Sequence, residues 1–222
     1  MSKLVEISDK VIVLSKTLKC LTHLFTKLRD KNTCSQDFKI YAKRLMTIIC
    51  EEGLSRVSPT EKTIVTPTGC EFHGESVEVK DIVAVSIIRA GDSMLDVFMG
   101  IVPEASVGKI LIQRNEETTL PMLYYSKLPP SIASKKVVLL DPMLGTGGSA
   151  KCAVKVLLDS GVKEENIHFF TVVSCPQGLN AVSTAYPSIT IVTAMMDEGL
   201  NEKAYIVPGL GDFGDRFFGT EA

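Results

Sequence analysis

The feature that most constrains the fold is an alternation of short apolar runs with stretches of helical periodicity. Runs rich in Val and Ile predict strands at 82–88, 108–113, 137–140, 167–173 and 189–193. Helical stretches are predicted between them, at 94–99, 149–158 and 177–186. Strands that alternate with helices in this way are typical of βαβ units. We therefore predict an α/β fold with a central, mainly parallel sheet flanked by helices.

The N-terminal part of the chain is predicted to be helical. Apolar residues recur at helical spacing from 18 to 28 and from 40 to 49. Ser35 is a candidate N-cap for the second helix and Gly53 a candidate stop. The turn-rich stretch 57–75 then predicts a hairpin. No repeat, low-complexity tract or linker interrupts the 222 residues, which favours one domain spanning 1–222.

Composition and charge exclude several classes of protein. A formal net charge of -2 provides no overall basic field for nucleic acid. The longest apolar runs fall far short of the roughly 20 residues that a membrane helix needs. The six cysteines show no metal-ligand spacing and there is no secretory signal, so we expect reduced thiols in a soluble, cytoplasmic protein. The three histidines are scattered and form no metal pattern.

The loop after the 137–140 strand carries the strongest local signal. It contains an acid, then glycines, then hydroxyls at the start of a helix: Asp141, Pro142, Met143, Leu144, Gly145, Thr146, Gly147, Gly148 and Ser149. Ligands of parallel sheets bind beyond the carboxyl ends of strands, as here. Free N–H groups and the helix dipole favour a phosphate at a helix N-terminus, and glycines allow it to approach closely.

Four interpretations of this loop compete. Gly145, Gly147 and Ala150 formally fit a dinucleotide fingerprint, but no acid stands at the end of the next strand. A Walker loop would end in Gly-Lys-Ser/Thr, which this loop lacks. A tight turn without a ligand is the third. The fourth fits both halves of the loop: Asp141 holds the hydroxyls of a ribose while the loop amides, with Thr146 and Ser149, hold its 5′-phosphate.

The segment from Asp141 to Ser149 resembles the phosphoribosyl-binding loop of uracil phosphoribosyltransferases. Its single acid followed by proline resembles the uracil enzymes, whereas other members of the superfamily usually carry two adjacent acids. The resemblance runs from about Leu18 to Thr220. It implies a type I phosphoribosyltransferase fold with an N-terminal helical region, 1–56, and a C-terminal uracil-binding hood, 195–222.

Two arginines match the diphosphate-binding residues of that family. Arg89 follows the 82–88 strand, Arg114 follows the 108–113 strand, and planar guanidinium groups suit phosphate oxygens. The stretch that leads from Arg114 to Pro129 resembles a mobile flap over the active site. Asn115 stands where family members often carry aspartate. Its neighbours Glu116 and Glu117 also fit a charged, solvated loop.

Asp92 and Ser93 stand where many bacterial relatives have an apolar residue and glycine. They place the resemblance closer to the eukaryotic and protozoan branch.

The stretch 205–216 resembles the uracil-binding hood. By this resemblance, uracil is bound by Ile206, Gly211, Asp212 and Phe213, with main-chain groups around Ile206, Gly211 and Phe213 contacting the edge of the pyrimidine. Asp212 matches a family acid near the diphosphate and its metal. Four glycines near a C-terminus are also typical of a flexible tail, but the apolar residues among them argue against one.

The resemblance implies transfer of a phosphoribosyl group from 5-phosphoribosyl 1-diphosphate to uracil, forming UMP and diphosphate in pyrimidine salvage. Asp141, Arg89, Arg114 and Asp212 are the expected catalytic residues. Mg²⁺ is expected to arrive with the diphosphate, because no carboxylate cage for a metal is visible in the sequence.

The resemblance also implies partners and regulation. It points to a homodimer or homotetramer. Some relatives are activated by GTP through basic residues in the N-terminal helices. Lys31 fits such a site, whereas Thr22 is not the arginine expected there, which argues against GTP control.

Three alternatives stay open. A regulator on the same scaffold that binds RNA would need a basic face, which the net charge disfavours. An enzyme for another base, such as a purine or orotate, is the second; orotate would favour a basic partner in the hood, where only Arg216 is available. The third is the decayed half of a kinase fusion. The chain contains no kinase segment and keeps the acid, the arginines and the glycine loop.

Overall fold

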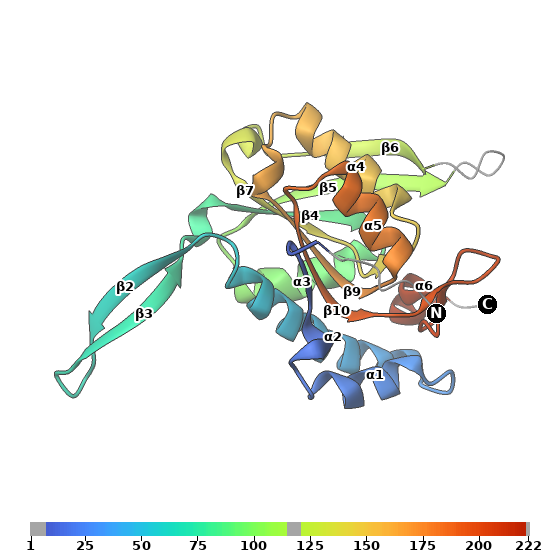
Figure 1. Ribbon diagram of the computed structural model, residues 1–222, viewed down its shortest axis with the longest axis horizontal. Coiled ribbons are helices and arrows are strands. Elements are labelled where there is room, and N and C mark those ends of the chain that lie inside the picture. The colour runs from blue at the N-terminus through green and yellow to red at the C-terminus, as the bar shows by residue number, and fades with distance from the viewer. Residues whose placement is uncertain (1–7, 115–120, 221–222) are drawn as a thin grey trace.

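The computed structural model describes residues 8–114 and 121–220. Within them, one eight-stranded sheet forms the centre of the molecule (Figure 1). Its order is β1 (Val11–Val13), β10 (Thr190–Met196), β9 (Ile167–Ser174), β7 (Lys136–Leu140), β4 (Ile82–Ile88), β5 (Ser106–Arg114) and β6 (Pro121–Lys127), with β8 (Met143–Leu144) beside β9. Strands β5 and β6 are antiparallel and the other pairs are parallel. The predicted α/β fold is confirmed.

Helices cover both faces of the sheet. Helices α2 (Ser35–Leu54) and α3 (Gly91–Ile101) pack on one face, and α4 (Gly148–Asp159) and α5 (Pro176–Ala185) lie on the other (Figure 1). Successive strand residues face opposite sides, so neighbouring phenylalanines of β9 belong to different core clusters. This double burial explains why the central strands are continuous apolar runs.

The two predicted N-terminal helices are present as α1 (Leu21–Arg29) and α2, although strand β1 and a 3-10 helix precede them. The predicted caps of α2 are wrong by a short distance. Cys34 is the N-cap and Ser35 the first helical residue. Gly53 lies inside the helix because α2 packs tightly there; a Cβ would lie 2.2 Å from the ring of Phe170. The glycine therefore serves packing on β9 rather than helix termination.

The predicted hairpin is confirmed and lies apart from the sheet. It consists of β2 (Pro59–Val65) and β3 (Glu71–Val77), which pair only with each other and project from the body of the molecule (Figure 1). Several elements have no counterpart in the prediction: β1, β6, β8, β11 (Gly199–Leu200), β12 (Ile206–Val207) and α6 (Phe213–Phe218). Short 3-10 helices occupy Leu14–Lys16, Val79–Asp81, Ile132–Ser134 and Glu164–Asn166. None of the described helices is long and apolar enough to cross a membrane.

The parallel strands bring their carboxyl ends to one edge of the sheet. Strand β4 lies between β5 and β7, so the loops that follow these three strands are neighbours. The start of α3 approaches the end of β7 so closely that a Cβ on Gly91 would lie 2.3 Å from the carbonyl oxygen of Leu140. Glycine is required at this position, and the turn after β4 is held against the loop after β7.

Candidate active site

The loop after β7 is braced along its length by β9. The main-chain N–H of Asp141 donates to the carbonyl of Phe170, with N and O 3.3 Å apart. The carbonyl of Pro142 accepts from Val172 and Val173 at 3.1 and 3.0 Å. Strand β8 then pairs with the end of β9. The loop is therefore part of the sheet's hydrogen-bonded framework and has a fixed path.

The second half of the loop forms a small hollow at the N-terminus of α4. Gly147 caps the helix with φ +79°, a left-handed conformation that favours glycine. Helix α5 packs so closely on the loop that a Cβ on Gly178 would lie 2.4 Å from the carbonyl oxygen of Gly145. The hollow has a volume of about 60 Å³ and is lined by Asp141 and residues 143–150. Free N–H groups at this helix terminus suit a phosphate.

Asp141 stands at the boundary between this hollow and a larger cleft. Its Oδ1 accepts from the N–H of Met143 at 3.4 Å. Burial raises the pKa of Asp141 to about 7, the Met143 N–H opposes the rise, and the nearby charge of Asp212 adds to it. Among the salt bridges of the described residues, none involves Asp141.

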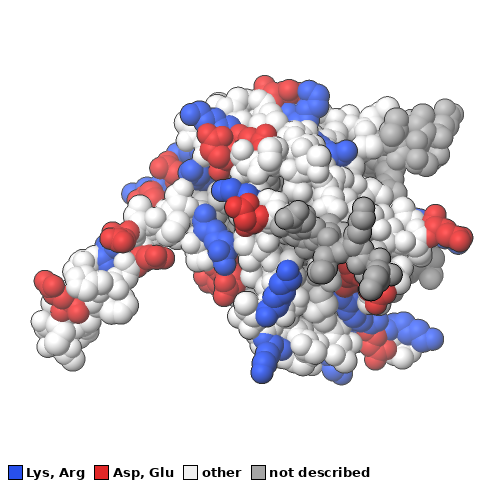
Figure 2. Space-filling view, in the orientation of Figure 1, with Lys and Arg blue, Asp and Glu red and all other residues white. Residues whose placement is uncertain are grey.

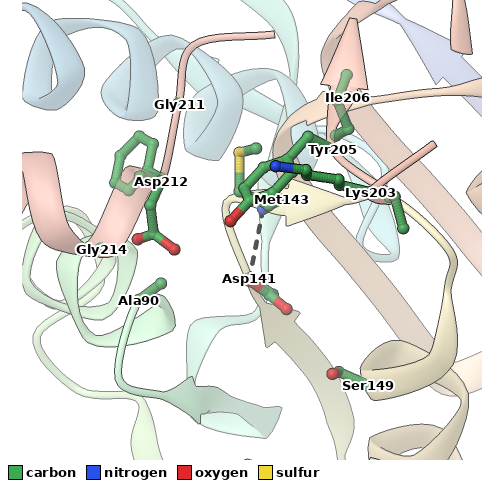
Figure 3. Close-up of a pocket in the computed structure, with 13 residues that line it drawn as sticks. Ala90, Asp141, Met143, Ser149, Lys203, Tyr205, Ile206, Gly211, Asp212 and Gly214 are labelled. Atoms are coloured by element: carbon green, nitrogen blue, oxygen red, sulfur yellow. Dashed lines mark hydrogen bonds between the residues drawn. The ribbon is translucent and has the colours of Figure 1, made fainter. Parts of the chain in front are cut away.

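The larger cleft lies between the loop and the C-terminal segment. Its volume is about 370 Å³, and Asp141, Ser149, Ile206 and Asp212 border the same open space (Figure 3). The predicted residues that line it are Asp141, Met143, Gly145, Ser149, Ile206, Gly211, Asp212 and Phe213. The predicted loop and hood, more than 40 positions apart in sequence, therefore face each other across one cleft.

The hood residues are anchored by their side chains. Ile206, Leu210 and Phe213 are buried in the core cluster that includes α2. Asp212 is the N-cap of α6 and accepts from the N–H of Asp215 at 2.9 Å. Because the apolar side chains are committed to the core, the main chain is the part of this segment most suited to contact a ligand.

Arg89 lies beside the cleft, in contact with the C-terminal helix. It follows β4 through a cis peptide bond with Ile88. Its Nη2 donates to Asp215 Oδ1 at 2.5 Å and its Nη1 to Thr220 Oγ1 at 3.1 Å. The Thr220 hydroxyl and then the Arg89 guanidinium hold the pKa of Asp215 below its usual range. A groove lined by Arg89 and Gln113 extends from here to the end of β5.

The turn that carries Arg89 is held by Asp92 and Ser93, the residues that differ from many bacterial relatives. Asp92 Oδ1 accepts from Ser86 Oγ at 2.6 Å, and both its oxygens accept from Lys109 Nζ at 3.0 Å. Ser93 Oγ donates to the carbonyl of Ala90 at 2.7 Å. These contacts join β4, β5 and α3. Lys109 was not predicted, although it is the one charged residue of its strand run.

The remaining predicted residues are placed as follows. Thr146, Gly147 and Gly148 line the small hollow, and the side chain of Leu144 is buried in the core. Pro142 accepts the two hydrogen bonds from Val172 and Val173 that hold the loop on β9. Arg114 is the last residue of β5, where it pairs with Pro121. The predicted residues Asn115, Glu116 and Glu117 lie outside the described residues. Of the predicted flap, Pro121–Lys127 forms strand β6.

Sequence reasoning missed several residues that line the cleft: Ala90, Lys203, Ala204 and Gly214. Ala90 and Gly214 flank predicted residues, so their position in the chain was a usable signal. Lys203 precedes the hood motif in an exposed turn, and no local pattern distinguishes it from a surface lysine.

The fold and this cleft define a type I phosphoribosyltransferase. A loop held by hydrogen bonds to β9 ends at the N-terminus of α4, the buried carboxylate of Asp141 begins that loop, and the hood segment faces both across the cleft. The model of the family described as "Uracil phosphoribosyltransferase" matches residues 15–220. The chain belongs to the uracil phosphoribosyltransferase family.

Individual relatives agree with this assignment. The chain is 49% identical over 213 residues to "Uracil phosphoribosyltransferase" of Dictyostelium discoideum, covering 96% of this chain and 98% of that protein. It is 47% identical to "Uracil phosphoribosyltransferase 1" of Schizosaccharomyces pombe, with 96% of each covered. The solved AQ2163 protein from Aquifex aeolicus superposes with a TM-score of 0.81 at 33% identity, covering 96% and 99%. The predicted likeness to the eukaryotic members is confirmed.

We expect the Asp141→Asn variant to be more stable than the wild-type protein at pH 8 in the absence of ligands. The folded-state pKa of Asp141 lies above the unfolded value, so the native state retains its proton more strongly between about pH 4 and 7. Stability is therefore lost as the pH rises through that window, and the loss is complete above it. The asparagine removes this loss, which is on the order of 2–4 kcal/mol.

Thermal unfolding from pH 5 to 8.5 measures this effect. The advantage of Asp141→Asn should shrink as the pH falls from 7 towards 4. Asp96→Asn, a substitution at an exposed site on α3, is the matched control and should follow the wild type. A variant that is less stable than wild type at pH 8 would contradict the assigned environment of Asp141.

Proposed function

We propose that the protein transfers the phosphoribosyl group of 5-phosphoribosyl 1-diphosphate to uracil, with the catalytic and binding residues predicted from its sequence. Family membership supports the reaction, and one structural observation supports the location of the active site. The loop 141–149 and the hood segment 206–213 line opposite sides of the same cleft. That spacing allows one nucleotide to contact both.

Each part of the site has one task in this proposal. The amides of 145–149, with Thr146 and Ser149, hold the 5′-phosphate. Asp141 holds the ribose hydroxyls and offsets the positive charge that develops on the ribose as the diphosphate leaves. Uracil contacts the main chain around Ile206, Gly211 and Phe213, so that its N1 faces the anomeric carbon. Catalysis then rests on positioning and charge, without a covalent nucleophile.

Arg89 and Arg114 bind the departing diphosphate in this proposal. The Arg89 guanidinium already lies beside the cleft, and the groove next to it reaches β5, the strand that ends at Arg114. A guanidinium can form two parallel hydrogen bonds to phosphate oxygens, which suits a group that gains negative charge. For Arg89 this requires that the guanidinium leave or share its contacts with Asp215 and Thr220.

Mg²⁺ is proposed as the metal that accompanies the diphosphate. Among the described residues, no group of three or more His, Cys, Asp or Glu side chains could hold a metal by itself. The residues nevertheless fit a metal held mainly by substrate oxygens, because the Asp141 and Asp212 carboxylates line the same cleft. Burial is the main cause of the raised pKa of Asp141, and the nearby charge of Asp212 adds to it. When bound, Mg²⁺ supplies positive charge to the leaving diphosphate.

Two rival functions are less well supported. An RNA-binding regulator would need a continuous basic face, but acidic and basic side chains are interspersed on the face in Figure 2. An orotate enzyme would need a cation at the base. Arg216, the candidate cation of the hood, is buried and bonded to main-chain carbonyls of Leu28, Asp30 and Leu210. It is therefore engaged in structure, which favours an uncharged pyrimidine.

The expected result is UMP from uracil alone. Radiolabelled uracil, hypoxanthine and orotate are each incubated with 5-phosphoribosyl 1-diphosphate and Mg²⁺, and the nucleotide formed is measured. Asp141→Asn should lower kcat/KM by about 10²-fold or more, as loss of a transition-state electrostatic contact does. Asp96→Asn should keep full activity, and EDTA should abolish it. Well-folded protein that converts none of the bases would overturn the proposal.

We further propose a homodimer or homotetramer, with the β2–β3 hairpin in the interface. Ile64 and Phe72 lie directly opposite each other in the hairpin register and are 46% and 56% exposed; Val65, beside them, is 70% exposed. Large apolar side chains gathered on a projecting element are typical of an interaction surface. A second copy of the chain is the proposed occupant, because family resemblance implies a homo-oligomer. We do not include GTP activation, since Thr22 stands in place of the expected arginine.

Light scattering after size-exclusion chromatography tests the oligomer. Wild type should elute at twice or four times the mass of the chain, and the double variant Ile64→Ser, Phe72→Ser should shift to a smaller species. Ile40→Ser, which changes an equally exposed apolar residue outside the hairpin, is the control and should not shift. A monomeric wild type, or a double variant with unchanged mass, would refute the proposed interface.

The cytoplasm is the proposed compartment. All six cysteines are free thiols, which suits a reducing environment. Fractionation of cells that express the tagged protein tests this, and recovery in an oxidising compartment would count against it.

A further inference from the structure

Two arginines tie the end of helix α1 to the hood. Arg29, the last residue of α1, contacts the end of β10 and the turn of the hood, and Arg216, from α6, contacts the end of α1. This arrangement is not accounted for by the proposed roles of the loop, Arg89, Arg114 and the hood. It joins residues from the N-terminal and C-terminal parts of the chain.

Arg29 forms a bidentate ion pair with Asp197. Its Nη1 lies 2.8 Å from Asp197 Oδ2 and its Nη2 lies 2.5 Å from Asp197 Oδ1. The Asp197 side chain is 2% exposed and that of Arg29 is 20% exposed. Paired guanidinium and carboxylate groups in this geometry are directional as well as strong. Asp197 is itself fixed, because its N–H donates to the carbonyl of Ser174 at 2.8 Å.

Gly209 is held by both members of this pair. Its carbonyl accepts from Arg29 Nη1 at 2.6 Å, and its N–H donates to Asp197 Oδ2 at 2.8 Å. Gly209 has φ +62°, and a Cβ would lie 2.1 Å from the carbonyl oxygen of Ile206, so the turn tolerates only glycine. The ion pair therefore fixes the main chain between Ile206 and Gly211, two residues that line the cleft.

Arg216 supports the next part of the same segment. Its guanidinium donates to the carbonyls of Leu28 and Leu210 and, at 2.8 Å, to that of Asp30. Its stem lies under Gly211, where a Cβ would be 3.4 Å from Arg216 Cδ. The guanidinium also stacks on Phe38 of α2, 4.4 Å from the ring centroid. Both arginines thus connect the end of α1 to the hood.

We propose that Arg29, acting through Asp197 and Gly209, is a positioning residue for uracil recognition. Arg29 fixes the position of the hood main chain that lines the cleft, so this contact from the end of α1 determines the affinity for the base. The inference rests on the proposed function and adds residues that do not touch the substrate. A base read by main-chain groups cannot be accommodated by side-chain rotation, which makes recognition sensitive to small shifts of the backbone.

A purely structural role is the competing explanation. In that case, loss of the ion pair would lower thermal stability and leave the relative affinity for ligands unchanged. The two roles are separated by comparing UMP, which contacts loop and hood, with ribose 5-phosphate, which contacts the loop alone. The ratio of the Kd for UMP to the Kd for ribose 5-phosphate therefore measures the contribution of the hood to binding.

Arg29→Lys is the first test, because lysine keeps the charge but cannot span both oxygens of Asp197 and the carbonyl of Gly209. We expect the Kd for UMP, measured by calorimetry, to rise tenfold or more, and that for ribose 5-phosphate to change less than twofold. The KM for uracil should rise with the Kd for UMP, and the KM for the diphosphate substrate should stay within twofold.

Two further variants keep the result interpretable. Asp197→Asn, which preserves shape, should also raise the ratio of the Kd for UMP to the Kd for ribose 5-phosphate, and it replaces Arg29→Lys if that variant does not fold. Lys135→Met removes an ion pair with Asp81 at the amino ends of β7 and β4, away from the cleft. This variant should lower stability without changing the ratio of the two Kd values. A folded Arg29 or Asp197 variant that keeps the wild-type ratio of the two Kd values would overturn this inference and leave the proposed function standing. A wild type that binds UMP no better than ribose 5-phosphate would overturn the proposed function and, with it, this inference.

Discussion

The carboxylate of Asp141 is the constraint around which the site is organised. It stands at the end of a buried strand, receives one long hydrogen bond from Met143, and lies near the like charge of Asp212. Burial is unfavourable for a charged group, which is the main reason why the pKa of Asp141 rises to about 7. In the proposed function, this carboxylate lies where positive charge develops on the ribose, so the interaction that the buried acid lacks would be formed in the reacting complex.

The other parts of the site can be understood from their relation to this carboxylate. Gly91 and Gly178 are required because helices on both faces of the sheet press against the loop from Leu140 to Gly145. Helix α6 links the two proposed substrate regions: its N-cap, Asp212, borders the cleft, and Asp215 holds Arg89. A shift of the main chain at Asp212 would therefore be transmitted to Arg89 through α6, a helix of six residues. The Arg29 pair fixes the same segment from the opposite side.

The sequence predicted the centre of the fold well because burial on both faces gives strands such as β4 and β9 an uninterrupted apolar pattern. Strand β6 escaped prediction because it is an exposed edge strand whose residues alternate in no simple way. Strand β1 has only three residues, too few for a periodic signal. Gly53 was misread as a helix stop because its reason, the ring of Phe170, is distant in sequence.

The candidate site divides in the same manner. The acid and glycines of the loop are contiguous, so a local motif could identify them. The contacts that position the hood and Arg89 are not local: Arg29 and Asp197 are 168 positions apart, and Arg89 and Asp215 are 126 apart. No spacing rule connects such residues. The structure was needed to bring the loop and the hood to one cleft and to identify Lys109 and Arg29 as supports.

The most direct test of the account is a crystal structure of the protein with UMP. The account predicts one nucleotide in the cleft, with its phosphate on the amides of 145–149, its ribose hydroxyls on Asp141, and its uracil edge on the main chain of 206–213. A phosphate bound elsewhere, or a uracil ring turned away from the hood into solvent, would contradict the claim that these two segments form a single nucleotide site.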